Sequence, residues 1–216
     1  MFKHETQVIK FLLQWYSVNA RNLPWRKKNT LNLPDPYFVF VSEYMLQQTT
    51  VNTVKNKFNE FILKWPSLNK LAQTSEPNIL KFWSGLGYYS RARNLLKSAK
   101  IIKNNFKNKI PETYDELIQL PGIGDYTAKA ILGIGYNKSV MPLDANIERI
   151  LVRLHAIDKP INKVKNKLKD LGKKFISDKY SSNLIQSFMD YGSEICLPRN
   201  PKCNICGINK FCQSYK

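Results

Sequence analysis

The sequence predicts an all-α protein. Apolar residues recur at spacings of three and four in several segments, which is the pattern of helices with one buried face. No segment alternates apolar and polar residues as a half-buried strand does, and there is no internal repeat. The 216 residues are 43% hydrophobic and 12% aromatic, so the chain is globular and long enough for one large domain or two small ones.

The chain carries a formal net charge of +18 at pH 7. Such a charge fits a polyanionic partner, but a composition rich in Lys, Asn and Ile would produce it as well. No apolar run is long enough to span a membrane, and no signal peptide is visible near the N-terminus. We therefore expect a cytoplasmic protein that has no membrane partner.

The N-terminal third contains two predicted helices. Residues 7–18 form an amphipathic helix, and Leu23–Arg26 follow as an extended segment in which Arg26 is available to pair or to contact a phosphate. Ser42 is the expected N-cap of a long helix that runs to Trp65. Glu43 falls in the first turn of this helix, among apolar neighbours, and we expect it to be buried.

Two polar segments interrupt the predicted core. Gln47–Thr50 are uncharged polar residues that suit either an exposed face or hydrogen bonds to base edges. Gly85–Asn94 places two tyrosines and two arginines where a loop meets a helix. These side chains suit stacking on bases and contact with phosphates, although a tyrosine pair that closes a small core is an alternative.

The stretch 120–132 reads as a helix, a hairpin and a second helix. Pro121 ends the first helix, while Gly122 and Gly124 allow a tight turn whose backbone N–H groups no side chain covers. Such a helix N-terminus binds a phosphate without a charged side chain. Asp144 follows about twenty residues later, in front of an apolar helix. A phosphate site beside one carboxylate suggests an enzyme that acts on nucleic acid.

Three further helices are expected at 145–155, 161–175 and 182–192. The run from Lys159 to Lys174 holds seven lysines around Ile161, Val164, Leu168 and Leu171. We interpret it as the solvated face of an ordinary amphipathic helix.

All four cysteines lie within the last 21 residues, at Cys196, Cys203, Cys206 and Cys212. Four thiols so close together, in a chain without a secretion signal, favour a metal site over disulfides. The spacing alone leaves open whether the site holds zinc or a [4Fe–4S] cluster.

Together these motifs resemble the helix–hairpin–helix DNA glycosylases of the endonuclease III superfamily. The resemblance runs from LPWR at Leu23 to Cys212 and includes LPGIG, LDAN and the cysteine spacing. SEYMLQQTT at Ser42 and GLGYYSRARN at Gly85 resemble the MutY-type adenine DNA glycosylases in particular. That type removes adenine mispaired with 8-oxoguanine or guanine from double-stranded DNA, and it implies a [4Fe–4S] cluster on the four cysteines.

The resemblance also implies roles for single residues. Glu43 matches the general acid that protonates the adenine, Asp144 the carboxylate that stabilises the cationic sugar, and Asn146 a residue that positions Asp144 and the water. Tyr126 stands where strand-cleaving relatives have a Schiff-base lysine, so hydrolysis without strand cleavage is expected. Gln48 and Tyr88 match side chains that wedge into the base stack, and Leu46 and Thr49 belong to the same lesion-facing segment. Arg91 and Arg26 are the expected phosphate contacts.

The implied fold has two helical subdomains. Residues 28–139 form a six-helix barrel that includes the hairpin at 120–132, and residues 1–27 and 140–216 form a helical domain with the cluster loop at 196–212. The active site is expected in the cleft between the subdomains, and a monomer is the default.

Two departures from the type affect the predicted substrate. The chain ends at Lys216, four residues after Cys212, so we expect either that it lacks the C-terminal domain that recognises 8-oxoguanine or that it is a truncated gene product. Ala145 replaces the glycine of the usual LDGN, as it does in short thymine–guanine mismatch glycosylases of the same superfamily. A thymine or uracil glycosylase is therefore the alternative enzyme. A non-catalytic helix–hairpin–helix DNA-binding protein and a purely redox or structural iron–sulfur protein are alternatives of other classes.

Overall fold

The computed structural model describes residues 3–215 and divides into two compact units. Asn22–Tyr136 form the central unit, and Met1–Arg21 with Asn137–Lys216 form the terminal unit. The boundaries thus fall at 21/22 and 136/137, where the sequence led us to expect 27/28 and 139/140. Within the described residues there is no β-strand, only an isolated bridge between Lys28 and Pro34, so the all-α prediction is confirmed.

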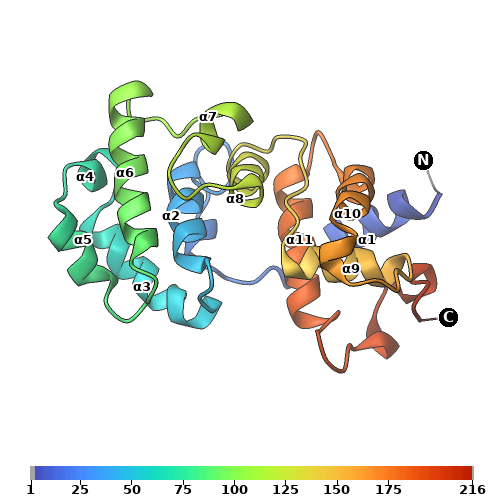
Figure 1. Cartoon of the computed structure of the whole chain (residues 1–216). Coiled ribbons are helices and arrows are strands. Elements are labelled where there is room, and N and C mark those ends of the chain that lie inside the picture. The colour runs from blue at the N-terminus through green and yellow to red at the C-terminus, as the bar shows by residue number, and fades with distance from the viewer. Residues whose placement is uncertain (1–2, 216) are drawn as a thin grey trace. The chain divides into compact units, whose positions relative to one another are not determined.

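The central unit is a set of helices (Figure 1), and aromatic side chains make up much of its core. Helix α6 lies beside α4, α5 and α2, and α2 also packs against the last helical turn of the unit, η2. Its elements are η1 (Pro24–Arg26), α2 (Pro36–Leu46), α3 (Val51–Lys64), α4 (Leu68–Ala72), α5 (Glu76–Trp83), α6 (Ser90–Asn105), α7 (Tyr114–Ile118), α8 (Asp125–Ala130) and the π-helical turn η2 (Ile131–Gly135). Its fully buried side chains include Phe40, Tyr44, Phe58, Phe61 and Trp83.

The predicted long helix from Ser42 to Trp65 is wrong, because two helices occupy this stretch. α2 begins earlier, at Pro36, where the Asp35 carboxylate accepts a hydrogen bond from the Tyr37 N–H and Pro36 supplies a favourable first residue. Residues 47–50 form the turn between the helices, and the Thr50 side chain caps α3. The polar interruption seen in the sequence is therefore a break between two helices.

The terminal unit is built around α11 (Ser181–Glu194), which packs against α1 (Lys3–Asn19) and α9 (Ala145–Leu154) (Figure 1). The fully buried Asp190 on α11 accepts a hydrogen bond from Arg21 Nε at 2.6 Å, which ties the chain after α1 to α11. The other elements are η3 (Ile161–Lys163), α10 (Lys165–Gly172), η4 (Lys173–Phe175), η5 (Cys203–Ile205) and η6 (Asn209–Phe211).

The expected continuous helix over 161–175 is also wrong. Val164 has φ −122° and ψ 12°, which breaks the helical path between η3 and α10. Its side chain is buried, together with Leu168 and Leu171, so the apolar stripe packs as expected although the helix is interrupted. No helix among the described residues combines the length and the apolar character needed to cross a membrane.

Candidate functional site

Helix α2 places a carboxylic acid inside the central unit. Glu43 is only 6% exposed, and its neighbours Tyr44 and Met45 are fully buried, so the expected burial is confirmed. Glu43 and Gln47 are four residues apart at the end of this helix, and side chains so spaced lie on one face. The buried acid therefore sits one turn before the residue that reaches the hairpin.

Three side chains fix the hairpin to α2 and α6. The hydroxyl groups of Tyr44 and Ser98 both donate to the carbonyl of Pro121, and Gln47 Nε2 donates to the carbonyl of Gly122 at 3.2 Å. Burial raises the pKa of the Tyr44 phenol, so the group remains a hydrogen-bond donor at neutral pH. The position of the hairpin thus depends on the helix that carries Glu43.

The two glycines of the hairpin serve different purposes. Gly122 has φ +80°, and a Cβ there would lie 2.9 Å from Asn94 Nδ2 and 3.1 Å from Tyr44 Cε1. Gly124 is extended, with φ −103°, and a Cβ there would meet no other atom within 4 Å. Gly122 is therefore required by the turn itself, whereas Gly124 leaves open space at the start of α8.

Tyr126 lies in the first turn of α8 and is half-buried. The short helix continues directly into the π-helical turn η2, a geometry that occurs often at functional sites. Beside Tyr126, Asp125 is held in place by Lys129 Nζ at 2.8 Å and by the Tyr114 hydroxyl at 3.0 Å. Tyr126 is thus presented by an ordered turn.

The predicted wedge residues lie on two loops of the central unit. Gln48 is exposed and follows α2, while Tyr88 is 59% exposed and precedes α6. Both have left-handed backbones, with φ 54° and 47°, which is uncommon for residues other than glycine. Leu46 and Thr49 flank Gln48 and are half-buried, and the Thr49 N–H donates to the Leu46 carbonyl at 3.2 Å.

The structure gives Arg91 another role than the phosphate contact expected from its sequence position. Its side chain is buried, and the guanidinium donates to five main-chain carbonyls, those of Tyr44, Met45, Gln47, Leu86 and Gly87. A side chain used in this way has little left to offer a phosphate. The other expected phosphate contact, Arg26, is half-buried at the end of η1.

In the terminal unit, Asp144 is the N-cap of α9. Its Oδ1 accepts from the Ile147 N–H at 2.7 Å, and its Oδ2 accepts from Asn146 Nδ2 at 2.9 Å. Both oxygens are therefore oriented by the first turn of the helix. The Asn146 amide thus contacts the carboxylate that the family resemblance pairs it with, while its catalytic role stays a prediction.

Burial raises the pKa of the Asp144 carboxyl above its ordinary value. The hydrogen bonds from Ile147 and Asn146 and the charge of Arg149 act in the opposite direction without cancelling that effect. Burial also raises the pKa of Glu148, one turn further along α9, and the nearby Asp144 charge adds to this effect. The carboxylate at 144 is therefore in a poorly solvated position, where its charge interacts strongly with a nearby cation.

Two residues that the sequence analysis missed support Asp144. Arg149 Nη2 donates to Asn146 Oδ1 at 2.8 Å and to the Gly192 carbonyl at 2.6 Å, and its Nε donates to the Cys196 carbonyl at 2.7 Å. Gly192 lies so close to α9 that a Cβ there would be 2.5 Å from Asn146 Cβ. The only signal in the sequence was the glycine inside the apolar pattern of α11.

All four cysteines line one cavity of the terminal unit, together with Ile150, Leu154, Ile195 and Ile208. No disulfide joins them, and each is half-buried. Arg153 Nη1 lies 3.2 Å from Cys196 Sγ, and the Tyr191 hydroxyl donates to Cys206 Sγ at 3.2 Å. Within residues 3–215, however, no group of three or more His, Cys, Asp or Glu residues is arranged to hold a single metal ion.

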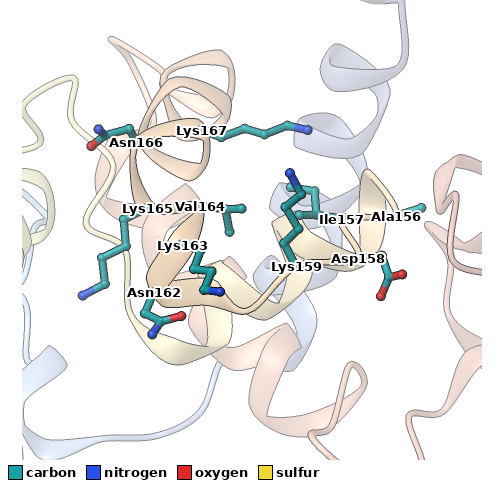
Figure 2. Close-up of a pocket in the computed structure, with 10 residues that line it drawn as sticks. All are labelled: Ala156, Ile157, Asp158, Lys159, Asn162, Lys163, Val164, Lys165, Asn166 and Lys167. Atoms are coloured by element: carbon teal, nitrogen blue, oxygen red, sulfur yellow. The ribbon is translucent and has the colours of Figure 1, made fainter.

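Lys159, Lys163, Lys165 and Lys167 are exposed, as predicted for a solvated face, and they also line a hollow of about 580 Å³, whose lining residues Figure 2 shows. Ten residues between Ala156 and Lys167 line it, among them Lys159, Lys163, Lys165 and Lys167. Asp158 is the acidic residue of the lining, and no salt bridge joins these four lysines to a carboxylate in the described part of the chain. The hollow therefore concentrates positive charge.

One protein family matches the segment that carries both acids and the hairpin. Residues 41–174, which include Glu43, the hairpin and Asp144, match the family model described as HhH-GPD superfamily base excision DNA repair protein. The chain therefore belongs to the HhH-GPD superfamily of base-excision DNA repair proteins. The cysteine loop lies outside the matched residues.

The curated relatives are similar over nearly the whole chain. An adenine DNA glycosylase of Buchnera aphidicola subsp. Schizaphis graminum (strain Sg) is 42% identical over 96% of this chain, which covers 59% of that protein. The adenine DNA glycosylase of Rattus norvegicus is 38% identical over 95% of this chain and is covered to 41%. The chain thus spans well under two thirds of the length of these relatives.

A solved structure of a thermostable thymine-DNA glycosylase has a similar fold. It aligns with a TM-score of 0.88 and 26% identity, covering 99% of this chain and 97% of that one. The all-helical fold is therefore that of known DNA glycosylases.

The two hairpin glycines give a matched pair of variants. Gly122→Ala should destabilise the protein by about 2 kcal/mol or more, because the added Cβ meets Asn94 and Tyr44 on a left-handed backbone. Gly124→Ala should leave the free energy of unfolding within about 0.5 kcal/mol of the wild-type value, because the space around it is open. Urea denaturation followed by circular dichroism measures both values. Equal destabilisation would contradict the assigned roles.

Proposed function

We propose that this chain hydrolyses the N-glycosidic bond of adenine mispaired with 8-oxoguanine or guanine in double-stranded DNA. The observation that carries the proposal is the buried Glu43 carboxylic acid, one turn before the Gln47 side chain that contacts the hairpin. The identity of about 40% to adenine DNA glycosylases over nearly the whole chain supports the choice of adenine.

Each of the two acids has a separate task in this reaction. The departing adenine is a poor leaving group as an anion, so Glu43 donates a proton to the base as the bond breaks. The sugar then develops positive charge, and the Asp144 carboxylate stabilises it. Asn146 holds Asp144 in position and orients the attacking water, whose proton passes to the Glu43 carboxylate left after the base is protonated.

The chemistry ends at base removal. Strand cleavage by this superfamily's lyase route needs an amine that forms an imine with the sugar, and Tyr126 offers a phenol at that position. We therefore propose a monofunctional enzyme whose product is an intact strand with an abasic site.

A thymine or uracil glycosylase is the second candidate. It is supported by the similarity to a solved thymine-DNA glycosylase, with a TM-score of 0.88 and 26% identity over 99% of this chain. The greater identity to the adenine enzymes, 42% against 26%, and the buried Glu43 favour adenine.

We propose a [4Fe–4S] cluster on Cys196, Cys203, Cys206 and Cys212. The four thiols line one cavity, but no three of them are arranged around a point that a single ion could occupy. A cluster binds one thiolate on each iron and so needs sulfur atoms further apart than the tetrahedral zinc site does. The cluster would supply structural order to the loop, and we assign it no step in base removal.

The partner is DNA, and the hollow at 156–167 is a proposed binding site for its backbone. Its lysines form no salt bridge within the described residues, so phosphates could neutralise them without breaking an ion pair of the protein. Four lysines line the hollow, and Figure 2 shows their side chains extending in different directions, which suits a chain of phosphates better than one fixed anion.

One panel of duplexes tests the activity and its substrate. It contains A opposite 8-oxoguanine, A opposite G, T opposite G and U opposite G, with products scored before and after alkali. We expect release of adenine and strand breaks only after alkali. Glu43→Gln and Asp144→Asn should each lower the single-turnover rate at least about 100-fold while DNA binding is retained. Release of thymine but not adenine would favour the second candidate.

The acid limb of the excision rate should reflect Asp144. Because its pKa is raised and its ionised form is needed, the rate should fall at a pH above the ordinary range of an aspartate. Asn146→Ala removes a hydrogen bond that favours the ionised form, so the limb should move to still higher pH. Single-turnover rates between pH 4 and 8 measure this, and a shift to lower pH would contradict the assignment.

The cluster prediction has a direct readout. Protein purified without oxygen should be brown and contain about four iron atoms per chain. A colourless protein with one zinc per chain would show that the cysteines hold another metal.

The salt dependence of binding tests the hollow. The triple variant K159S/K163S/K165S should bind undamaged duplex more weakly and lower the salt slope by about 0.9 for each phosphate that it no longer neutralises. The control K100S/K103S/K107S removes the same charge from α6 and the residues that follow it. Equal slopes for the two variants would mean that only net charge matters.

A further inference from the structure

We propose that Arg91 is a positioning residue that sets the backbone of both wedge residues, Gln48 and Tyr88. The proposal rests on the proposed function, because it takes these two side chains to enter the base stack. It concerns how the chain holds them in place before DNA arrives.

The first observation is where the guanidinium donates. Arg91 Nη1 donates to the carbonyl of Gln47, and Nη2 donates to the carbonyl of Gly87 at 3.1 Å. These are the carbonyls of the peptide groups immediately before Gln48 and Tyr88. One planar group therefore fixes the two peptide planes from which the wedge side chains project.

The second observation is the strain at those positions. Gln48 and Tyr88 have φ values of 54° and 47°, and both carry large side chains that disfavour this region. Such a conformation persists only where the surroundings over-determine it. The Gly87 carbonyl also accepts from Trp83 Nε1 at 3.1 Å, and the Gln47 carbonyl accepts from Thr49 Oγ1 at 3.5 Å. Trp83 and Thr49 each donate a hydrogen bond to one loop, whereas Arg91 donates to both.

The third observation is the environment of Arg91. Its remaining carbonyl partners include those of Tyr44 and Met45, in the last turn of α2, which contains no basic residue of its own. A cation at a helix C-terminus is favoured by the unpaired carbonyls there. Its guanidinium carbon also lies 5.6 Å from the Trp83 ring centre and 5.5 Å from that of Tyr88. The residue is thus held by the segments that it joins.

Lysine cannot replace arginine here, although it keeps the charge. Its ammonium group is a single point with three donors, whereas the fork of Arg91 reaches carbonyls on two separate loops. Arg91→Lys should therefore keep the helix-terminus charge but release one loop or both.

The first test needs no DNA. Hydrogen–deuterium exchange should be at least tenfold faster in segments 46–50 and 86–90 of Arg91→Lys than in the wild type. The matched control is Arg93→Lys, two residues along α6, where the exposed side chain forms a salt bridge with Glu76. Unchanged exchange in Arg91→Lys would overturn the proposal, whether or not the protein excises any base.

The second test asks whether Arg91 acts through the wedge. In duplexes with 2-aminopurine at the target position, Arg91→Lys should lower the fluorescence rise on base extrusion, and should lower the single-turnover excision rate at least tenfold. In the Gln48→Ala/Tyr88→Ala background the same substitution should change the rate less than twofold. An equal loss in both backgrounds would indicate a general structural role and overturn the proposal.

A further variant, Arg91→Gln, separates the proposal from a failure to fold, because it keeps a small planar donor group. Arg91→Lys and Arg91→Gln are both measured at a temperature at which circular dichroism shows them folded. If the wild type extrudes 2-aminopurine but releases no base from any duplex, the proposed function is wrong while the positioning role stands. If only the exchange and extrusion results fail, the function stands and the role of Arg91 does not.

Discussion

In the central unit, the positions of Glu43 and of the hairpin depend on the C-terminal end of α2. This helix carries a buried acid, and its last carbonyls have no partners within the helix. Arg91, a buried cation on α6, donates hydrogen bonds to carbonyls of this last turn. Tyr44 on α2 and Gln47, the C-cap of α2, donate to two main-chain carbonyls of the hairpin. The acid, the hairpin and the two exposed loops are thus positioned by one helix terminus.

The terminal unit solves a similar problem with a different set of contacts. Asp144 is a carboxylate that burial disfavours, and it is kept in place by the first turn of α9 and by Asn146. Asn146 in turn is oriented by Arg149, which also binds the carbonyl of Cys196. The cysteine loop and the acid therefore share one hydrogen-bonded support, so that disorder in the loop would reach the acid through two side chains.

Much of this arrangement could be predicted from the sequence. The spacing of apolar residues predicted the all-α fold, and burial of Glu43 followed from its apolar neighbours. The motifs also led to the correct superfamily. The break between α2 and α3 was missed, because the apolar stripe of Val54, Phe58 and Phe61 appeared to continue that of the preceding segment. The spacing of apolar residues does not reveal a turn when the helices before and after it both bury apolar faces.

The side chains that act through other residues were not predictable in this way. Arg91 looked like a phosphate contact because its neighbours are tyrosines and glycines, and only the three-dimensional structure brings five carbonyls to it. Arg149 and Gly192 carry no motif of their own. Partners 43 to 47 residues apart in the chain leave no local pattern.

The close approach of Gly192 to Asn146 limits how this sequence can evolve. Every other amino acid would add a Cβ that collides with Asn146, so no conservative replacement exists at this position. In any descendant that keeps the Asp144–Asn146–Arg149 arrangement, selection should purge all missense changes at residue 192, even though it lies on α11, outside the matched family segment, and has no side chain that could act on a base.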